Sequence, residues 1–111
     1  MINKQYKLLT ADDFSSVFNF KRRISSQHFF LHLSPNKLNN YRAAVIVSKK
    51  VEKLAVRRNY MIRLVLMCIF HQFPHLAQKF DLVFRVKESF YRHDVQVIKS
   101  EIDGLLNKVT L

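Results

Sequence analysis

The residues best suited to chemistry are cations that gather ahead of an apolar run. Residues 47–63 hold a single acid, Glu52, and residues 64–70 are all apolar. In a helix, Asn59 and Arg63 share one face. Arginine can fork onto phosphate oxygens, and asparagine can pair with a base edge or a 2′-hydroxyl. The pattern predicts an RNA-binding turn at the start of a helix, with a solvated basic face as the alternative. Its cations are Lys49, Lys50, Lys53, Arg57, Arg58 and Arg63.

Aromatic residues form a second candidate site. Phe14 and Phe18 are four residues apart on an expected helix, and the basic run 21–23 follows them. Aromatic rings between cations are typical of proteins that bind single-stranded RNA, because unpaired bases stack on them. The alternative is that these rings pack in the core.

No catalytic centre is visible in the sequence. His28 and His32 would lie about 13 Å apart in a strand, too far for one metal ion. Pro74 interrupts helical geometry between His71 and His75. No set of nucleophile, base and orienting group is present. We therefore expect a binding protein with no catalytic residue and no metal site of its own.

The composition points to a polyanionic partner. The chain has 111 residues, with 19 Lys and Arg against 8 Asp and Glu, a formal charge of +11. Its length fits one domain, residues 1–111. The single cysteine, Cys68, suits a reducing compartment. The apolar runs are far shorter than the roughly 20 residues of a membrane span. We expect a cytoplasmic protein with no membrane partner and no small-molecule substrate.

The elements that must position these residues follow in the order α-β-β-α-β-α. Hydrophobic periodicity predicts a helix over 11–19, with Thr10 as its cap. Alternating and β-branched apolar residues predict strands over 27–33, 41–47 and 80–86. The first two strands are expected to pair as a hairpin. Side chains at 28, 30 and 32 should share one face. A long helix should begin near 53–54 and end before Pro74, and a last helix should begin at Asp94. The expected fold is a small α/β (α+β) two-layer sandwich.

Two motifs resemble those of a known family. Residues 48–63, SKKVEKLAVRRNYMIR, resemble the signature of the protein subunit of bacterial ribonuclease P. Residues 9–18 resemble that family's Asp-Phe-x-x-Val-Phe segment. The resemblance covers nearly the whole chain. It implies the ribosomal protein S5 domain 2-like fold, with a left-handed βαβ crossover.

The resemblance also implies a function. The family's protein binds ribonuclease P RNA, which uses Mg²⁺ to remove the 5′ leader of precursor tRNA. By this likeness, the residues against the catalytic RNA are Lys49, Lys50, Lys53, Arg57, Arg58, Asn59 and Arg63. Those expected at the leader of the precursor tRNA are Phe14, Phe18, Arg22, Arg23, His32, Arg42, Arg85 and Lys87.

The helix motif departs from the family pattern. Ile62 stands where the family has a lysine, and Leu66 and Met67 replace an arginine and an acid. The expected RNA-facing helix is thus less charged. A stand-alone RNA-binding or ribosome-associated module of the same fold is the alternative function. A basic amphipathic protein on an anionic membrane is disfavoured, because the cations precede the apolar run instead of flanking it.

Overall fold

The computed structural model describes residues 11–36, 41–72 and 80–110, and Thr10 lies outside them. The elements are α1 (Ala11–Phe20), β1 (Arg22–Ser25), β2 (Phe29–Pro35), β3 (Arg42–Ile46), α2 (Ala55–Gln72), β4 (Phe80–Val86), the short 3₁₀ helix η2 (Arg92–Asp94) and α3 (Val95–Thr110). The predicted sandwich is confirmed, with one strand more than expected.

The sheet has the order β1-β2-β4-β3. β2 pairs antiparallel with both β1 and β4, and β3 pairs parallel with β4. The predicted hairpin of strands 27–33 and 41–47 is therefore wrong, because β4 lies between them. The reason lies in β4 itself. Leu82 and Phe84 are buried on one face and Val83 on the other, and a strand covered on both faces belongs in the centre of a sheet.

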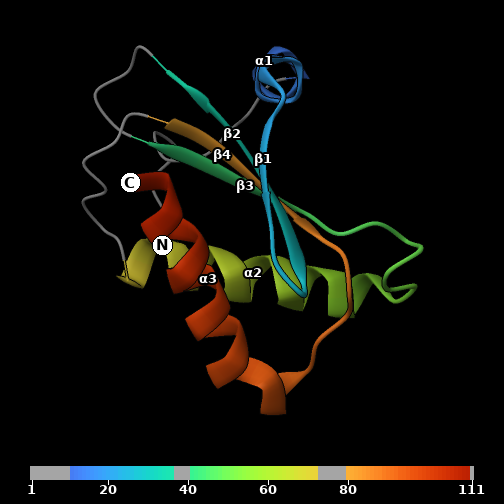
Figure 1. Ribbon diagram of the computed structural model, residues 1–111. Helices are drawn as coiled ribbons and strands as arrows, with labels where there is room; N and C mark the ends of the chain where they lie inside the picture. The colour runs from blue at the N-terminus through green and yellow to red at the C-terminus, as the bar shows by residue number, and fades with distance from the viewer. Residues whose placement is uncertain (1–10, 37–40, 73–79, 111) are drawn as a thin grey trace.

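The main core lies between the sheet and two helices. Alternate residues of β2 and β4 point toward α2 and α3, which cover one face of the sheet (Figure 1). Burial of these apolar side chains supplies the main driving force for folding. The fully buried members include Phe29, Leu31, Leu33, Met61, Val65, Leu82, Phe84, Ile98, Ile102 and Leu106.

Helix α1 lies alone on the opposite face (Figure 1). Its Val17 is fully buried against Val83 of β4. Phe14 and Phe18 pack around this pair. The second face of the sheet is thus only partly covered, and side chains beyond α1 remain accessible.

The additional strand, β1, is short, charged and on the sheet edge, with its four residues exposed or only partly buried. Sequence periodicity could not reveal it, because an edge strand need not bury an apolar face. Lys21 joins it to α1 with a φ of 62°. This left-handed conformation ends the helix and turns the chain straight into the strand.

Helix α2 explains the apolar run. Val65, Cys68 and Ile69 are buried, whereas Met67 is 63% exposed. Most residues of the apolar run 64–70 are therefore buried or partly buried, and the exposed face of the helix lies elsewhere. Of the helices in residues 11–36, 41–72 and 80–110, none is both long and apolar enough to cross a membrane.

Candidate RNA-binding surface

A partly buried phenylalanine lies among three cations on the sheet face that carries α1. The ring centroid of Phe30 lies 4.6 Å from the guanidinium carbon of Arg23, 5.4 Å from that of Arg85 and 4.5 Å from Nζ of Lys87. Register explains the grouping, because Phe30 pairs with Arg85 and Arg23 pairs with the next outward residue of β2. These four residues are called the Phe30 cluster. Cations at an aromatic ring offer both stacking and charge.

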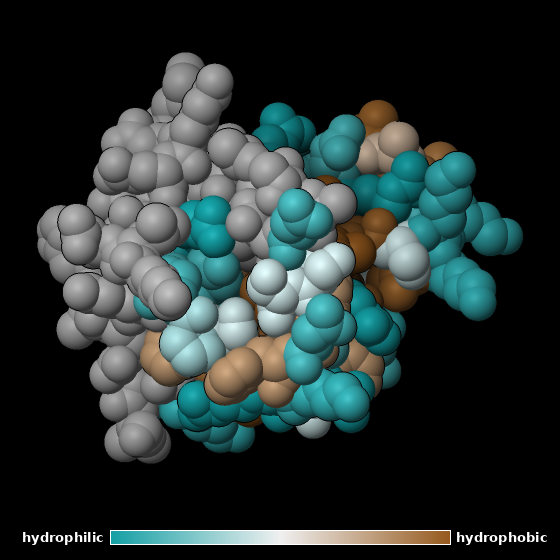
Figure 2. All heavy atoms as spheres, turned by 90° about the horizontal axis from the view of Figure 1, so that it is seen from above, coloured by the Kyte–Doolittle hydropathy of each residue, from teal (hydrophilic) through white to brown (hydrophobic). Residues whose placement is uncertain are grey.

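A groove of about 430 Å³ opens beside this cluster. Phe30, Arg85 and Lys87 line one part of it, and Ile46 and Lys50 line another. Seen from above, the described part of this side shows hydrophilic residues around small hydrophobic patches (Figure 2). A groove with an aromatic floor and cationic sides suits a single nucleic-acid strand.

His32 lies under α1, next to the Phe30 cluster. Its ring meets Phe18 edge-on, with 4.8 Å between centroids. Its Nε2 atom is buried and has no hydrogen-bond partner within the described residues. Burial lowers the pKa of His32, and the charges of Arg85 and Arg23 lower it further. The imidazole is therefore neutral at neutral pH.

Phe14 and Phe18 are both partly buried. They pack on the sheet through Val17 and Val83, so core packing explains part of each ring. Their remaining surface borders the exposed side of the sheet. Both rings therefore pack partly in the core, and part of each ring remains accessible to solvent.

Two arginines predicted for the leader site lie outside the Phe30 cluster. Arg22 pairs with Leu33, so it points to the opposite face from Arg23, and its guanidinium lies 5.8 Å from the ring centroid of Phe80. Arg42 donates two hydrogen bonds to Asp81, at 2.7 and 2.9 Å. A buried carboxylate needs such a partner, so Arg42 has a clear structural role.

The basic turn between β3 and α2 is exposed at all three lysines, Lys49, Lys50 and Lys53. The amides of Val51 and Glu52 both donate to the carbonyl of Ser48, at 3.1 Å each, which closes the turn. Lys50 also lines the groove of the Phe30 cluster, so it connects the two predicted sites.

The two consecutive arginines of α2 differ in their contacts. Nη1 of Arg58 donates to the carbonyls of Glu52 and Lys53, at 2.9 and 2.8 Å. Its side chain thus ties the helix to the preceding turn. Arg57 lies 3.8 Å from the carboxylate of Glu52 and remains 51% exposed. Its guanidinium is also 4.9 Å from the ring centroid of Tyr91.

Asn59 and Arg63 are both exposed on α2. Their spacing of four residues places them on one face of the helix, as the sequence predicted. Met67 continues that face where related sequences were expected to carry charge, and it is exposed. This surface is therefore basic at the start of the helix and apolar farther along.

Comparison with known proteins decides the family. The model of the Ribonuclease P family matches residues 2–110. The chain belongs to the ribonuclease P protein family. The ribonuclease P protein component of Chromobacterium violaceum is 34% identical over 109 residues, which cover 96% of this chain and 87% of that protein.

Solved structures of ribonuclease P proteins share the fold. The protein from Thermotoga maritima superimposes with a TM-score of 0.80 at 22% identity, covering 92% of this chain and 96% of that one. The protein from Staphylococcus aureus gives a TM-score of 0.78 at 18% identity, covering 90% and 94%. The shared architecture is therefore that of the ribonuclease P proteins.

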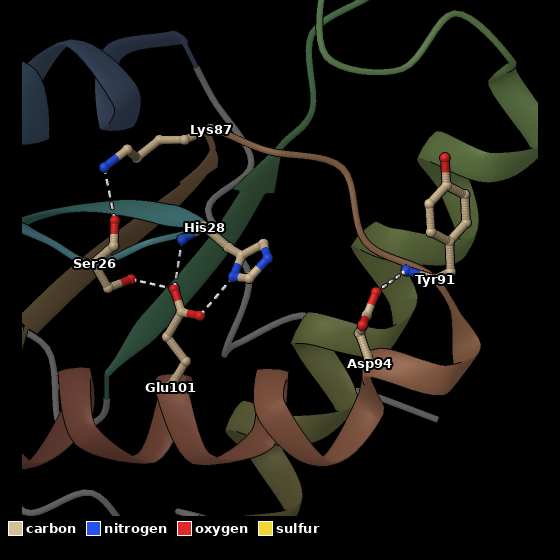
Figure 3. Close-up of polar contacts among 6 residues, drawn as sticks. All are labelled: Ser26, His28, Lys87, Tyr91, Asp94 and Glu101. Atoms are coloured by element: carbon tan, nitrogen blue, oxygen red, sulfur yellow. Dashed lines mark hydrogen bonds and ion pairs between the residues drawn. The ribbon is translucent and has the colours of Figure 1, made fainter.

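His28 does not lie on the face predicted for it. It precedes β2 and turns toward α3, where its Nδ1 and backbone amide each lie 2.7 Å from the carboxylate of Glu101 (Figure 3). The hydroxyl of Ser26 donates to the same carboxylate. Nζ of Lys87 donates to the carbonyl of Ser26 at 2.7 Å. The strand begins at Phe29, two residues later than predicted, so its alternation does not extend to position 28.

The carboxylates that could bind a metal ion already have hydrogen-bond or ion-pair partners in the protein. Glu52 accepts from the amide of Leu54, Asp81 is paired with Arg42, and Glu101 accepts from His28. Among the residues that the structure describes, no three His, Cys, Asp or Glu side chains come together as a metal site. These donor sets therefore do not fit a protein-bound Mg²⁺, which prefers several free oxygen ligands.

The sequence pattern predicts the outward strand face of Phe30 but does not single it out as a candidate site residue. The sequence did contain one hint. Arg23 and Arg85 each belong to a strand that pairs with the strand of Phe30. Finding the cluster required knowing that β1 and β4 flank β2.

Proposed function

We propose that this family member acts as the protein component of a bacterial ribonuclease P that trims precursor tRNA. In this proposal the chain binds the catalytic RNA through the basic turn and α2, and binds the 5′ leader across the Phe30 cluster. The observation that carries the proposal is the Phe30 cluster itself. It places a partly exposed aromatic ring among three cations on a half-covered sheet face.

The leader is proposed to lie along the groove beside Phe30. An unpaired base stacks on the accessible aromatic surface while its phosphates lie near Arg23, Arg85 and Lys87. Lys50 adds a further cation to the lining of the groove. Sequence-independent stacking and charge suit leaders that vary in sequence.

The catalytic RNA is proposed to contact the other basic surface. Arg63 and Asn59 present donors from one face of α2, and Lys49 and Lys53 add charge from the turn. Arg58 contributes chiefly by holding this turn in place through its two carbonyl contacts. Arg22 and Arg42 are proposed to act through structure and charge more than through direct leader contact.

The chemistry is proposed to belong to the RNA. No carboxylate set described above fits Mg²⁺, so the ions that assist hydrolysis would be held mainly by RNA phosphates. The protein contributes positive charge, which reduces repulsion between the catalytic RNA and its substrate. No membrane or small-molecule partner is needed, and the cytoplasm is the proposed location.

A cleavage assay tests this function. The purified chain is added at low magnesium concentration to a bacterial ribonuclease P RNA and precursor tRNA. Faster release of the 5′ leader than with RNA alone supports the proposal. RNA binding without faster cleavage would favour a stand-alone RNA-binding module, and leader release by the protein alone would overturn the assignment of chemistry to RNA.

A further inference from the structure

A second groove, separate from the Phe30 cluster, lies between the first turns of α2 and the segment that leads into η2. Its volume is about 450 Å³. The lining residues are Val56, Arg57, Tyr60, Phe90, Tyr91, Arg92 and His93. None of them lines the groove beside Phe30.

The walls of this groove combine aromatic rings with arginines. The rings of Tyr91 and His93 are nearly parallel, 16° apart, with 5.9 Å between their centroids. The guanidinium of Arg57 lies 4.9 Å from the ring centroid of Tyr91, and that of Arg92 lies 5.9 Å from the ring centroid of Tyr60. Each tyrosine thus has a cation beside it.

Tyr91 is accessible and its backbone is held in place. The residue is 43% exposed. Its amide donates to Oδ2 of Asp94 at 3.0 Å, while its ring points away from that carboxylate (Figure 3). An aromatic ring that is exposed on a fixed backbone is a ready stacking surface, because little conformational entropy is lost when a base covers it.

Two acids lie near the groove and offset part of its positive charge. Glu52 lies 3.8 Å from Arg57, but its carboxylate is mostly buried and also bonds the amide of Leu54 and the hydroxyl of Ser89. The carboxylate of Asp94 accepts a hydrogen bond from the Tyr91 amide, and its Oδ1 atom lies 3.6 Å from Nε2 of His93. The exposed charge at the mouth of the groove comes mainly from Arg57 and Arg92.

We propose that this groove is a second RNA-binding site, which takes one unpaired nucleobase on Tyr91 and the adjoining phosphate on Arg57 and Arg92. The size of the groove, the exposed ring and the two exposed arginines all match that ligand. The site rests on the RNA-binding function proposed above, but it does not depend on the leader groove. The protein would then contact single-stranded RNA on the side of the sheet that carries α2, in addition to the leader groove.

A tryptophan reporter tests base stacking directly. The chain contains no tryptophan, so Tyr91→Trp introduces a single fluorophore at the proposed site. Short oligouridylate should quench its emission, whereas inorganic polyphosphate of equal charge should not. Equal quenching by both would overturn base stacking in favour of a purely electrostatic site. The same titration in a Phe30→Ala background should quench equally, and loss of quenching there would show that the signal comes from the leader groove.

Affinity measurements complete the test. In the Phe30→Ala background, Tyr91→Ala should weaken binding of labelled oligouridylate about tenfold, the effect of losing one stacked base. Tyr91→Phe keeps the ring and should bind as the parent does. An unchanged affinity for Tyr91→Ala would refute the site. If wild-type protein still stimulates leader release by the catalytic RNA, only this second site would fail, not the proposed function.

Discussion

The ring of Phe18 in α1 meets the ring of His32 in β2 edge-on, at 4.8 Å between centroids. This contact fixes a helix to the half-covered face of the sheet directly beside the Phe30 cluster. It also buries part of an imidazole that has two arginines nearby. Packing of α1 and the charge state of the candidate leader site are therefore linked through one side chain.

The first prediction concerns the pH dependence of stability. The folded state lowers the pKa of His32 below its ordinary value of 6.5. The unfolded chain therefore binds more protons at this position than the folded chain does. His32 should cost no stability above pH 6.5, and it should destabilise the fold as the pH falls below that value toward the lowered pKa.

Urea denaturation of the wild type and of His32→Phe measures this effect. Between about pH 7.5 and pH 5.5, the wild type should lose more free energy of unfolding than the variant does. The variant retains an aromatic ring against Phe18. Because both proteins contain the other histidines, the contributions of those residues cancel in the comparison. Parallel losses in the two proteins would show that His32 titrates normally in the fold.

The second prediction concerns the carboxylate that links α3 to the sheet. Glu101 accepts hydrogen bonds from Ser26 and from the amide and ring of His28. Glu101→Ala should lower the free energy of unfolding by about 2 kcal/mol, because these partners are partly buried. Asp103→Ala removes an exposed carboxylate from the same helix and serves as the control. Equal effects of the two changes would mean that the Glu101 contacts contribute nothing specific.

The third prediction separates Arg58 from Arg63. Arg58→Ala should lower the free energy of unfolding by about 1 kcal/mol, since two carbonyl contacts at the start of α2 are lost. Arg63 is exposed, so Arg63→Ala should leave stability unchanged within about 0.5 kcal/mol. Thermal or urea unfolding of both variants measures the difference. Two equally stable variants would remove the structural role assigned to Arg58.

Salt dependence provides the complementary measurement for Arg63. If its guanidinium contacts one phosphate, Arg63→Ala should reduce the slope of log K against log salt by about 0.7–0.9. The binding partner is the catalytic RNA, and Asn59→Ala serves as a neutral control on the same helix face. A slope identical to that of the wild type would exclude Arg63 from the phosphate contacts.

Local patterns predicted most elements, whereas pairing between distant segments did not follow from them. Alternation in residues 80–86 correctly predicted the strand β4. It could not show that β4 would separate β2 from β3, because pairing is decided by the whole sheet. The exposed strand β1 carried no periodic signal at all.

The candidate site shows the same division. The spacing of Asn59 and Arg63 correctly predicted their shared helix face. Neighbouring arginines in a strand were harder to interpret, because Arg22 and Arg23 point to opposite faces. The ion pair of Arg42 with Asp81 joins two strands distant in sequence, so its structural role became visible only in the folded protein. The handedness of the β3-α2-β4 crossover stays a prediction from family resemblance.

The most direct test of the central claim is the affinity of Phe30→Ala for precursor and mature tRNA, measured in complex with a ribonuclease P RNA. The Phe30 cluster is proposed to hold the leader, which mature tRNA lacks. The variant should therefore bind precursor tRNA about tenfold more weakly and mature tRNA as tightly as the wild type does. Phe20→Ala, which removes a phenylalanine that is 52% exposed on α1, is the control. Equal losses for precursor and mature tRNA, or no loss for either, would contradict a leader site at Phe30.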